Sequence, residues 1–266
     1  MAFDNRCRLF LLIIGLALSR PADAQAPSSN FPTQQASHPS DDREVSIREL
    51  PGNLVRDQKQ IWSYPFKPER INRWWPPVIV LGVTGAFVAS DPYTGPHFLN
   101  ATAFHGYNRV FSSANSEAII LAAPAALYGI GWLRKDSYTQ SSALLAAEAA
   151  ADVYLLDMPF KLASARRQPL SYTGSGPYVD SFFDGSHNPF HSGGFYSGHA
   201  ALSMSVAAVI AHRYRHHRWV PFVAYGLAGA ISFSRVTTKN HFPADAVFGS
   251  TMGFLVAHYV VLPPHQ

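Results

Sequence analysis

Six apolar stretches, separated by runs of turn-forming residues, occupy most of the chain after Arg73. They are rich in Ala, Leu and Val, and their apolar residues do not alternate with polar ones as they would along a half-buried strand. The pattern predicts helices, so the expected fold class is all-α, a helical bundle of about six core helices. The expected helices cover residues 74–90, 118–133, 142–160, 199–211, 219–233 and 246–262.

The segments between these stretches predict turns and one long loop. Residues 91–96 and 174–177 are rich in Pro and Gly, which is typical of turns. The segment 168–196 contains no expected helix, and loops of that length are uncommon in compact domains unless they are functional or disordered.

Composition narrows the class of protein. Hydrophobic residues make up 47% of the 266 residues, which excludes wholesale disorder, and charged residues make up only 14%, against about 25% in an ordinary soluble domain. The shortage of charge indicates membrane contact or deeply buried helices. The formal net charge of +4 is too small and too scattered for a nucleic-acid binder. The single cysteine, Cys7, excludes a disulfide framework and a cysteine-ligated metal site.

The first 73 residues predict export. Arg6 and Arg8 precede the apolar residues 9–18, and Ala22-Asp23-Ala24 has the form of a cleavage site. We therefore expect a signal peptide at 1–24, with an uncleaved membrane anchor as the alternative. Residues 25–73 are expected to be a polar exported segment, disordered at least to residue 42, and 74–266 to be the helical domain.

Membrane embedding is left open between two arrangements. The stretches run from 13 to 19 residues, whereas a span takes about 20. The links at 134–135 and 212–218 are basic, which predicts a cytoplasmic position for both and places the loop 168–196 outside. We expect an inner-membrane protein with its site facing the periplasm; the alternative is a soluble periplasmic bundle.

Three segments near the ends of expected helices combine anion-binding and proton-transferring groups. Ser197 and Gly198 precede a helix, whose free N–H groups favour an anion. His199 and His241 can exchange protons near neutral pH, and Asp245 follows His241 by four residues, a spacing that lets its carboxylate reach the imidazole. A carboxylate on one ring nitrogen leaves the other free to attack. The cations that can grip phosphate oxygens are Lys161, Arg166, Arg167 and Arg235.

Taken singly, each of these residues has an ordinary structural explanation: a charged interface patch, a helix cap or a satisfied histidine. In combination they resemble the type 2 phosphatidic acid phosphatase and vanadium haloperoxidase superfamily. That family shows K-x6-R-P, P-S-G-H and S-R-x5-H-x3-D in this order, and the third motif matches in full at Ser234, Arg235, His241 and Asp245. The resemblance covers roughly residues 116–262.

The resemblance implies a set of roles. Lys161, Arg235 and the region of Ser197 and Gly198 would hold the phosphoryl oxygens. His241 would attack phosphorus and form a phosphohistidine, oriented by Asp245. His199 would protonate the leaving alcohol and then activate water. The substrate would be a phosphorylated small molecule or a lipid, and no metal or other cofactor is expected.

Two positions depart from the motifs. Gln168 stands where K-x6-R-P has Arg, and we expect Arg167, or failing that Arg166, to supply the missing phosphate contact. Tyr196 replaces the proline of P-S-G-H. These departures motivate one alternative to the phosphatase, a degenerate anion-binding membrane protein. The resemblance itself implies a second alternative, a vanadate-dependent haloperoxidase, because vanadate resembles the pentacoordinate phosphoryl transition state.

Overall fold

The computed structural model describes residues 43–66, 75–99, 102–173, 177–185 and 194–263. The expected signal peptide and the expected tether through residue 42 lie outside the described residues. Within them the chain forms eight α-helices and no strand, which confirms the all-α prediction. The helices are α2 Leu50–Ser63, α3 Trp75–Leu99, α4 His105–Val110, α5 Ser113–Arg134, α6 Ser137–Ser164, α7 Gly198–Arg213, α8 Trp219–Thr237 and α9 Pro243–Val256.

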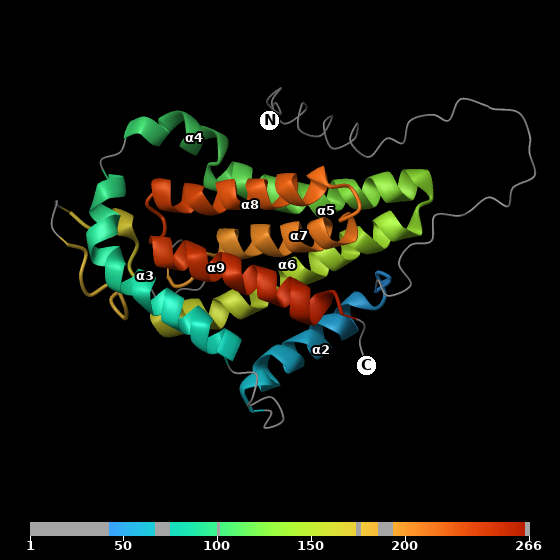
Figure 1. Cartoon of the computed structure of the whole chain (residues 1–266), viewed down its shortest axis with the longest axis horizontal. Coiled ribbons are helices and arrows are strands. Elements are labelled where there is room, and N and C mark those ends of the chain that lie inside the picture. The colour runs from blue at the N-terminus through green and yellow to red at the C-terminus, as the bar shows by residue number, and fades with distance from the viewer. Residues whose placement is uncertain (1–42, 67–74, 100–101, 174–176, 186–193, 264–266) are drawn as a thin grey trace, which may run out of the picture.

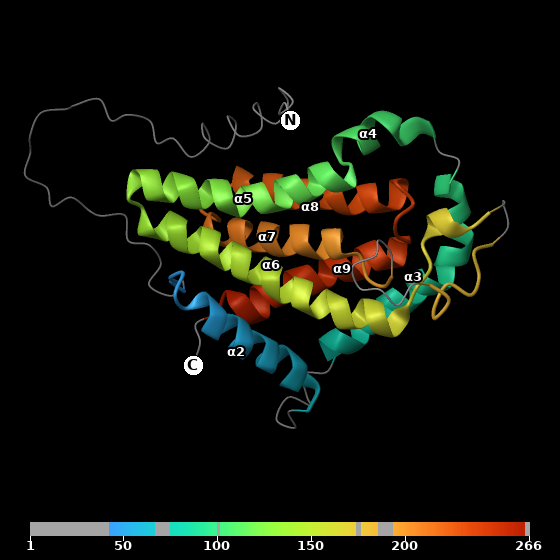
Figure 2. The ribbon, with the colours of Figure 1, turned by 180° about the vertical axis from the view of Figure 1, so that it is seen from behind.

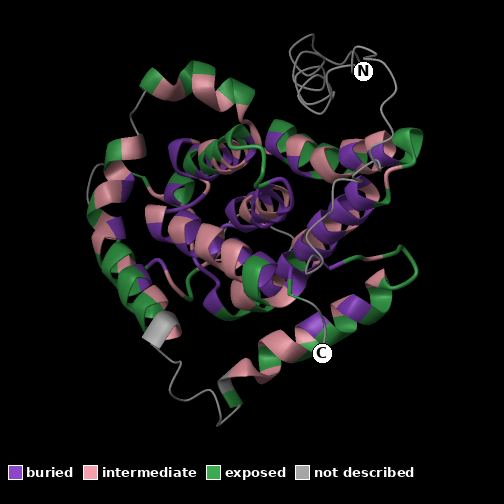
Figure 3. Ribbon diagram, turned by 45° about the vertical axis from the view of Figure 1, so that its right-hand side comes forward, coloured by how far each residue is buried: buried purple, intermediate pink, exposed green. Residues whose placement is uncertain are grey.

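Helix α7 lies at the centre and packs against α6, α8 and α9, while α5 packs on α6 (Figures 1 and 2). The core is made mainly of small and branched apolar residues such as Leu145, Ala149 and Val209. At Gly253 on α9, a Cβ would collide with the backbone of Ala201 on α7, so only glycine permits this close approach. Figure 3 shows the buried residues gathered on the inner helices and on the inward faces of the helices around them.

Local signals explain why several helices begin and end where they do. The Ser112 hydroxyl accepts from the backbone N–H of Asn115 at the start of α5. The Asp136 carboxylate likewise caps the start of α6, and Ala165, directly after the last residue of α6, has the left-handed conformation. Pro243 occupies the first turn of α9, where it costs no hydrogen bond. These caps make α5 and α6 longer than the apolar stretches that predicted them.

The turn expected at residues 91–96 was wrong, because α3 continues through Pro92 and Pro96 to Leu99. Proline inside a helix costs roughly 3 kcal/mol, so other contacts must hold this segment. The carbonyl of Pro92 accepts from the N–H of Tyr178, and Gly95 lies directly against the Tyr178 ring. These tertiary contacts hold α3 helical across its prolines.

Helix α2 lies within residues 25–73, which were expected to be a polar segment outside the helical domain. It packs on α6 largely through polar groups: Asn53 donates to Glu148 Oε2 over 3.1 Å, and Gln58 donates to Asp152 Oδ1 over 2.9 Å. Asn53 and Asp57 are its buried residues. A helix that buries a polar face gives no apolar stretch to detect.

The bundle has two distinct ends. We call one of them the basic end: it holds the basic links that connect α5 to α6 and α7 to α8. The Tyr214 hydroxyl donates to Thr139 and connects these two links. Arg43 enters the fold at this end, where its carbonyl accepts from Arg213 over 2.8 Å and its Nη1 donates to the Val261 carbonyl over 2.5 Å. At the opposite end, which we call the motif end, α6 and α8 finish and α7 and α9 begin (Figure 1).

Three described helical segments are long and apolar enough to cross a membrane: Pro77–Phe98, Ser113–Arg134 and Pro243–Val261. Large apolar side chains are exposed on α3, α5 and α8, among them Ile79, Leu121, Leu133 and Phe222. Exposed apolar surface on several helices is typical of contact with lipid or with another protein.

Candidate active site

All three motif segments meet at the motif end. The backbone N–H of Ser197, just before α7, donates to the carbonyl of Asp245 in the first turn of α9 over 3.1 Å. The N–H of Leu170, after α6, donates to the carbonyl of Lys239, after α8, over 3.0 Å. The chain therefore brings helix ends from four elements to one place, as the three motifs require.

His241 and Asp245 face each other. The distance between His241 Nδ1 and Asp245 Oδ2 is 3.5 Å, longer than an ordinary hydrogen bond, and both side chains are almost fully buried. Contacts between catalytic groups often shorten in the complex with substrate or transition state. Asp245 Oδ2 also accepts from the N–H of Phe242 over 2.9 Å, which fixes the carboxylate against the helix start. With Nδ1 turned to Asp245, Nε2 of His241 is left for chemistry.

The second oxygen of Asp245 binds Arg166. The distance from Arg166 Nη1 to Asp245 Oδ1 is 2.5 Å, and Arg166 Nη2 lies 2.8 Å from Asp91 Oδ2 on α3. The Arg166 side chain is 1% exposed. The structure thus places Arg166, which the sequence analysis expected on phosphate, between two buried carboxylates.

Lys161, in the last turn of α6, pairs with Asp157 one turn earlier. Their Nζ–Oδ2 distance is 2.6 Å. Burial raises the pKa of the Asp157 carboxyl, while the charges of Lys161 and His241 oppose the rise. A Cβ at Gly198 would lie 2.7 Å from Asp157 Oδ2 and 3.4 Å from Lys161 Nζ. Glycine is therefore needed where the start of α7 meets this ion pair.

Ser197 occupies the N-cap position of α7 and is fully buried. Its hydroxyl makes no hydrogen bond within the described residues, and it does not cap the helix. The helix start therefore combines free N–H groups with an unused hydroxyl beside Lys161, a suitable setting for an anion.

His199 follows in the first turn of α7, and its Nε2 lies 3.2 Å from Glu117 Oε1 on α5. Burial, together with the charges of Arg235, His241 and Lys161, lowers the pKa of His199 to about 3. These charges place His199 electrostatically in the same site as His241. His199 is therefore neutral at ordinary pH.

Arg235, in the last turn of α8, is fully buried. It donates to the carbonyl of Phe111 and, over 2.9 Å, to the Ser113 hydroxyl at the start of α5. Burial lowers its pKa, and the charge of Glu117 opposes that effect. The guanidinium is held rigidly by protein groups beside His199.

The remaining expected residues lie at the edge of the site or in its packing. Arg167 pairs with Asp184 over 2.8 Å, and its side chain is one-third exposed. Gln168 precedes the short turn Pro169–Ser171. Tyr196 is fully buried, with its ring against those of Phe160, Phe195 and Phe248. The tyrosine that replaces proline is thus an aromatic core residue.

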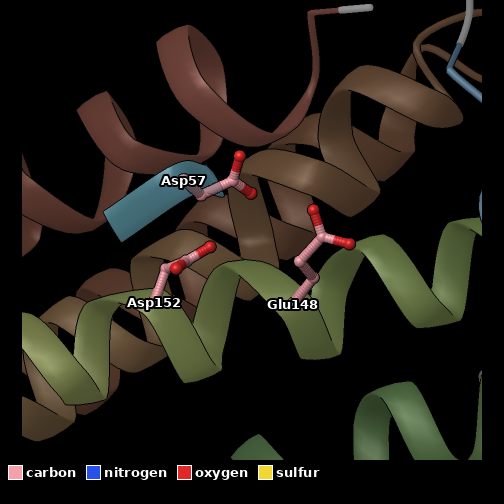
Figure 4. A group of neighbouring side chains, drawn as sticks. All are labelled: Asp57, Glu148 and Asp152. Atoms are coloured by element: carbon pink, nitrogen blue, oxygen red, sulfur yellow. The ribbon is translucent and has the colours of Figure 1, made fainter. Parts of the chain in front are cut away.

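Groups that can ligate a metal gather at one other place among the described residues (Figure 4). Oxygen atoms of Asp57, Glu148 and Asp152, one from each, lie within 4.8 Å of one another. Arg43 pairs with Glu148 over 2.7 Å. We call these three carboxyl groups the acid cluster. Burial is the main cause that raises the pKa of Asp57 to about 8 and that of Asp152 to about 7, so protons offset part of its charge.

Three residues at the motif end were missed by the sequence analysis as site residues: Asp91, Glu117 and Asp157. Asp157 carries a detectable signal, because it precedes Lys161 by four residues, the spacing of a helical ion pair. Asp91 and Glu117 lie outside the motif segments, and only the folded chain brings them to the site.

Taken together, the motif end gathers histidine, carboxylate and cationic side chains at the helix ends of an all-α protein. Residues 141–265 match the family model of the PAP2 superfamily, a stretch that includes most of α6, all of α7 to α9 and the three motifs. This region is a PAP2 superfamily domain, and members of this superfamily are generally phosphatases. No curated protein and no solved structure matches the chain.

Proposed function

We propose that the chain is a phosphatase that hydrolyses a phosphomonoester or a diphosphate through a phosphohistidine on His241. One observation carries the proposal: the His241–Asp245 pair lies at the same helix ends as His199, Lys161 and the start of α7. A nucleophile, its orienting carboxylate, a second histidine and an anion site are the parts that phosphoryl transfer through nitrogen needs.

In the first step, the lone pair of His241 Nε2 forms the N–P bond while the P–O bond to the leaving alcohol breaks. Asp245 holds the proton on Nδ1 and stabilises the positive charge that grows on the ring. His199 gives its proton to the leaving oxygen. In the second step, His199 takes a proton from water, whose oxygen bonds to phosphorus and releases phosphate and His241.

The electrostatics around His199 support its acid role. Burial is the main cause that lowers the pKa of His199, and the charges of Arg235, His241 and Lys161 lower it further. A bound phosphoryl anion opposes the effect of these charges, so substrate binding raises the pKa of His199 and favours the protonated form that donates. Lys161, Arg235 and the backbone at Ser197 and Gly198 are the proposed phosphate-binding groups, and they act by fixed charge.

The first experiment is a rapid-quench assay of the purified chain with a ³²P-labelled phosphate ester. A burst of label on histidine, stable in base and released in acid, supports the mechanism, and turnover without any labelled protein contradicts it. Two further results would redirect the assignment: bromide oxidation with peroxide and added vanadate indicates a haloperoxidase, and phosphate binding without turnover indicates a degenerate site.

The substrate class is proposed as a phosphorylated small molecule or a lipid phosphate. The exposed apolar side chains of α3, α5 and α8 support the lipid, because they would keep the site close to a bilayer surface. Comparing kcat/KM for one phosphate ester with and without acyl chains tests this. A preference of tenfold or more for the acylated ester supports a lipid, and equal values support the small molecule.

For location we propose the cell envelope, with the motif end facing the periplasm. The positive-inside tendency supports an inner-membrane arrangement, because the basic links between α5 and α6 and between α7 and α8 lie at the opposite end. The contacts of Arg43 support the soluble periplasmic alternative: an exported N-terminal segment is joined to the basic end, which would then lie outside as well.

A single cysteine decides between the two arrangements. His216 is exposed in the link between α7 and α8, so His216→Cys can be probed in intact cells after Cys7→Ser. Protection from a membrane-impermeant thiol reagent supports the inner-membrane arrangement. Rapid labelling supports the soluble alternative.

A further inference from the structure

Arg166 is held by protein groups on every side that the structure describes, and we propose that it and Asp91 are positioning residues that fix Asp245 for catalysis. On this assignment Arg166 acts through Asp245, and the bound phosphate is left to other groups. The inference rests on the proposed function, since it concerns the same nucleophile.

The guanidinium of Arg166 points its donors in three directions. Nη1 donates to Asp245 Oδ1 over 2.5 Å, Nη2 to Asp91 Oδ2 over 2.8 Å, and Nε to the Ser181 hydroxyl over 3.1 Å. Its two faces are covered as well, because the Phe182 and Phe242 ring centres lie 4.4 and 4.3 Å from Cζ. A group held in this way has fixed geometry, which suits a support for another residue.

Asp91 uses both of its oxygens. Oδ2 binds Arg166, and Oδ1 accepts from the backbone N–H of Ala244 over 3.2 Å. Ala244 immediately precedes Asp245 in the first turn of α9. Asp91 therefore fixes Asp245 in two ways, through Arg166 on its side chain and through the backbone of its neighbour. Asp91 is fully buried, so both contacts are shielded from water.

The charges explain which step this arrangement assists. Two carboxylates and one guanidinium carry a net charge of −1 next to His241. When Nε2 bonds to phosphorus and Nδ1 keeps its proton, the ring becomes positively charged, and the neighbouring negative charge stabilises it. The free histidine lacks this charge, so the benefit is realised on the way to the phosphohistidine. Phosphate binding itself gains nothing from Arg166 held in this way.

Two variants separate positioning from phosphate binding. Asp91→Asn keeps the shape of the side chain and removes one negative charge. Arg166→Lys keeps the positive charge but cannot donate to Asp245, Asp91 and Ser181 in the same geometry. For each we would measure the single-turnover rate of phosphohistidine formation and the inhibition constants of inorganic phosphate and vanadate. Replacing a residue that orients a functional side chain typically lowers activity 10–100-fold. We expect the rate to fall by that factor and the inhibition constant of phosphate to stay within about threefold.

The matched control is Asp184→Asn, an exposed carboxylate that should leave the rate and the inhibition constants unchanged. Burst amplitude counts the folded sites, so partial misfolding lowers the amplitude without changing the rate per site. A rise in the phosphate inhibition constant at an unchanged rate would overturn the positioning role. So would wild-type rates in both variants. If the wild-type chain forms no phosphohistidine, the proposed function fails instead, and the two failures are distinguishable.

Discussion

Two groups of buried carboxylates in the described part of the chain each contact one arginine. They differ in how their negative charge is neutralised. At the motif end, Asp91 and Asp245 share Arg166 in short, well-aligned contacts. In the acid cluster, three carboxyl groups share Arg43. The first group is nearly balanced by a fixed cation, whereas the second depends on bound protons. Buried charges are paired or neutralised, and this chain uses both means.

The comparison indicates that the two groups serve different purposes. A fixed cation orients a carboxylate and favours its ionised form, which suits the role proposed for Asp245. In the acid cluster, protonated carboxyl groups can donate hydrogen bonds to neighbouring carboxylates and so hold α2 against α6. These hydrogen bonds are lost when the carboxyl groups are deprotonated.

The largest effect is expected at the nucleophile. His241→Ala should lower kcat by at least about 10⁴-fold, because the attacking nitrogen is lost. Turnover and labelled protein are both measured, and folding is checked by circular dichroism. The matched control is Asp152→Asn in the acid cluster, which should keep turnover within about threefold. A large loss of turnover in Asp152→Asn would contradict the view that the acid cluster takes no part in catalysis.

The next effect concerns stability. Arg166→Met leaves Asp91 and Asp245 buried without their cation, and breaking such a pair costs roughly 3–5 kcal/mol of unfolding free energy. Arg167→Met, one residue along, removes only a partly exposed pair with Asp184 and should cost less than about 1 kcal/mol. Denaturant titration of both variants checks this. Equal losses would show that burial of the network is not what stabilises this end.

A smaller effect is expected from pH. The folded chain holds protons on Asp57 and Asp152 up to about pH 8 and 7, whereas the unfolded chain releases them near pH 4. The folded cluster binds more protons between these limits, so its contribution to stability is full below pH 4 and falls as the pH rises toward 8. Asp57→Asn should flatten this slope and raise stability at pH 8 by on the order of 2 kcal/mol. An unchanged slope between pH 5 and 8 would contradict the proton-bound cluster.

The smallest effect tests the expectation that Arg167 replaces the missing arginine at position 168. Arg167 pairs with Asp184 at the surface and stacks on the Tyr172 ring, so we expect Arg167→Ala to change kcat/KM by less than about threefold. A fall of 10²–10³-fold would instead establish Arg167 as a phosphate-binding residue. Gln168→Arg, measured alongside, shows whether the site gains from a cation at the family position.

The sequence predicted the six helices of the body because each carries a long apolar stretch. It failed where tertiary contacts override local signals. Pro92 and Pro96 read as a turn, yet contacts with Tyr178 keep α3 helical. Helix α2 escaped detection because its buried residues include Asn53 and Asp57, whose partners are side chains of α6.

At the motif end, the sequence predicted the pair of His241 and Asp245 from their spacing, and the structure brings them face to face. The sequence could not predict that Arg166 binds Asp245 and Asp91 together. Asp91 lies 75 residues before Arg166, on α3. No local pattern marks Asp91 as its partner. Spacing within one helix can be read from sequence, whereas contacts between distant helices need the fold.

The hydrogen bond from Arg43 to the carbonyl of Val261 joins positions 218 residues apart. Closing so long a loop costs chain entropy, which is recovered only after the helices between have packed. In a chain synthesised from its N-terminus, α2 is complete long before its partner residues on α6 and beyond α9 exist. We therefore expect α2 to dock last. Until it does, the carboxyl groups of the acid cluster stay hydrated and charged, and the final folding step takes up protons from the medium.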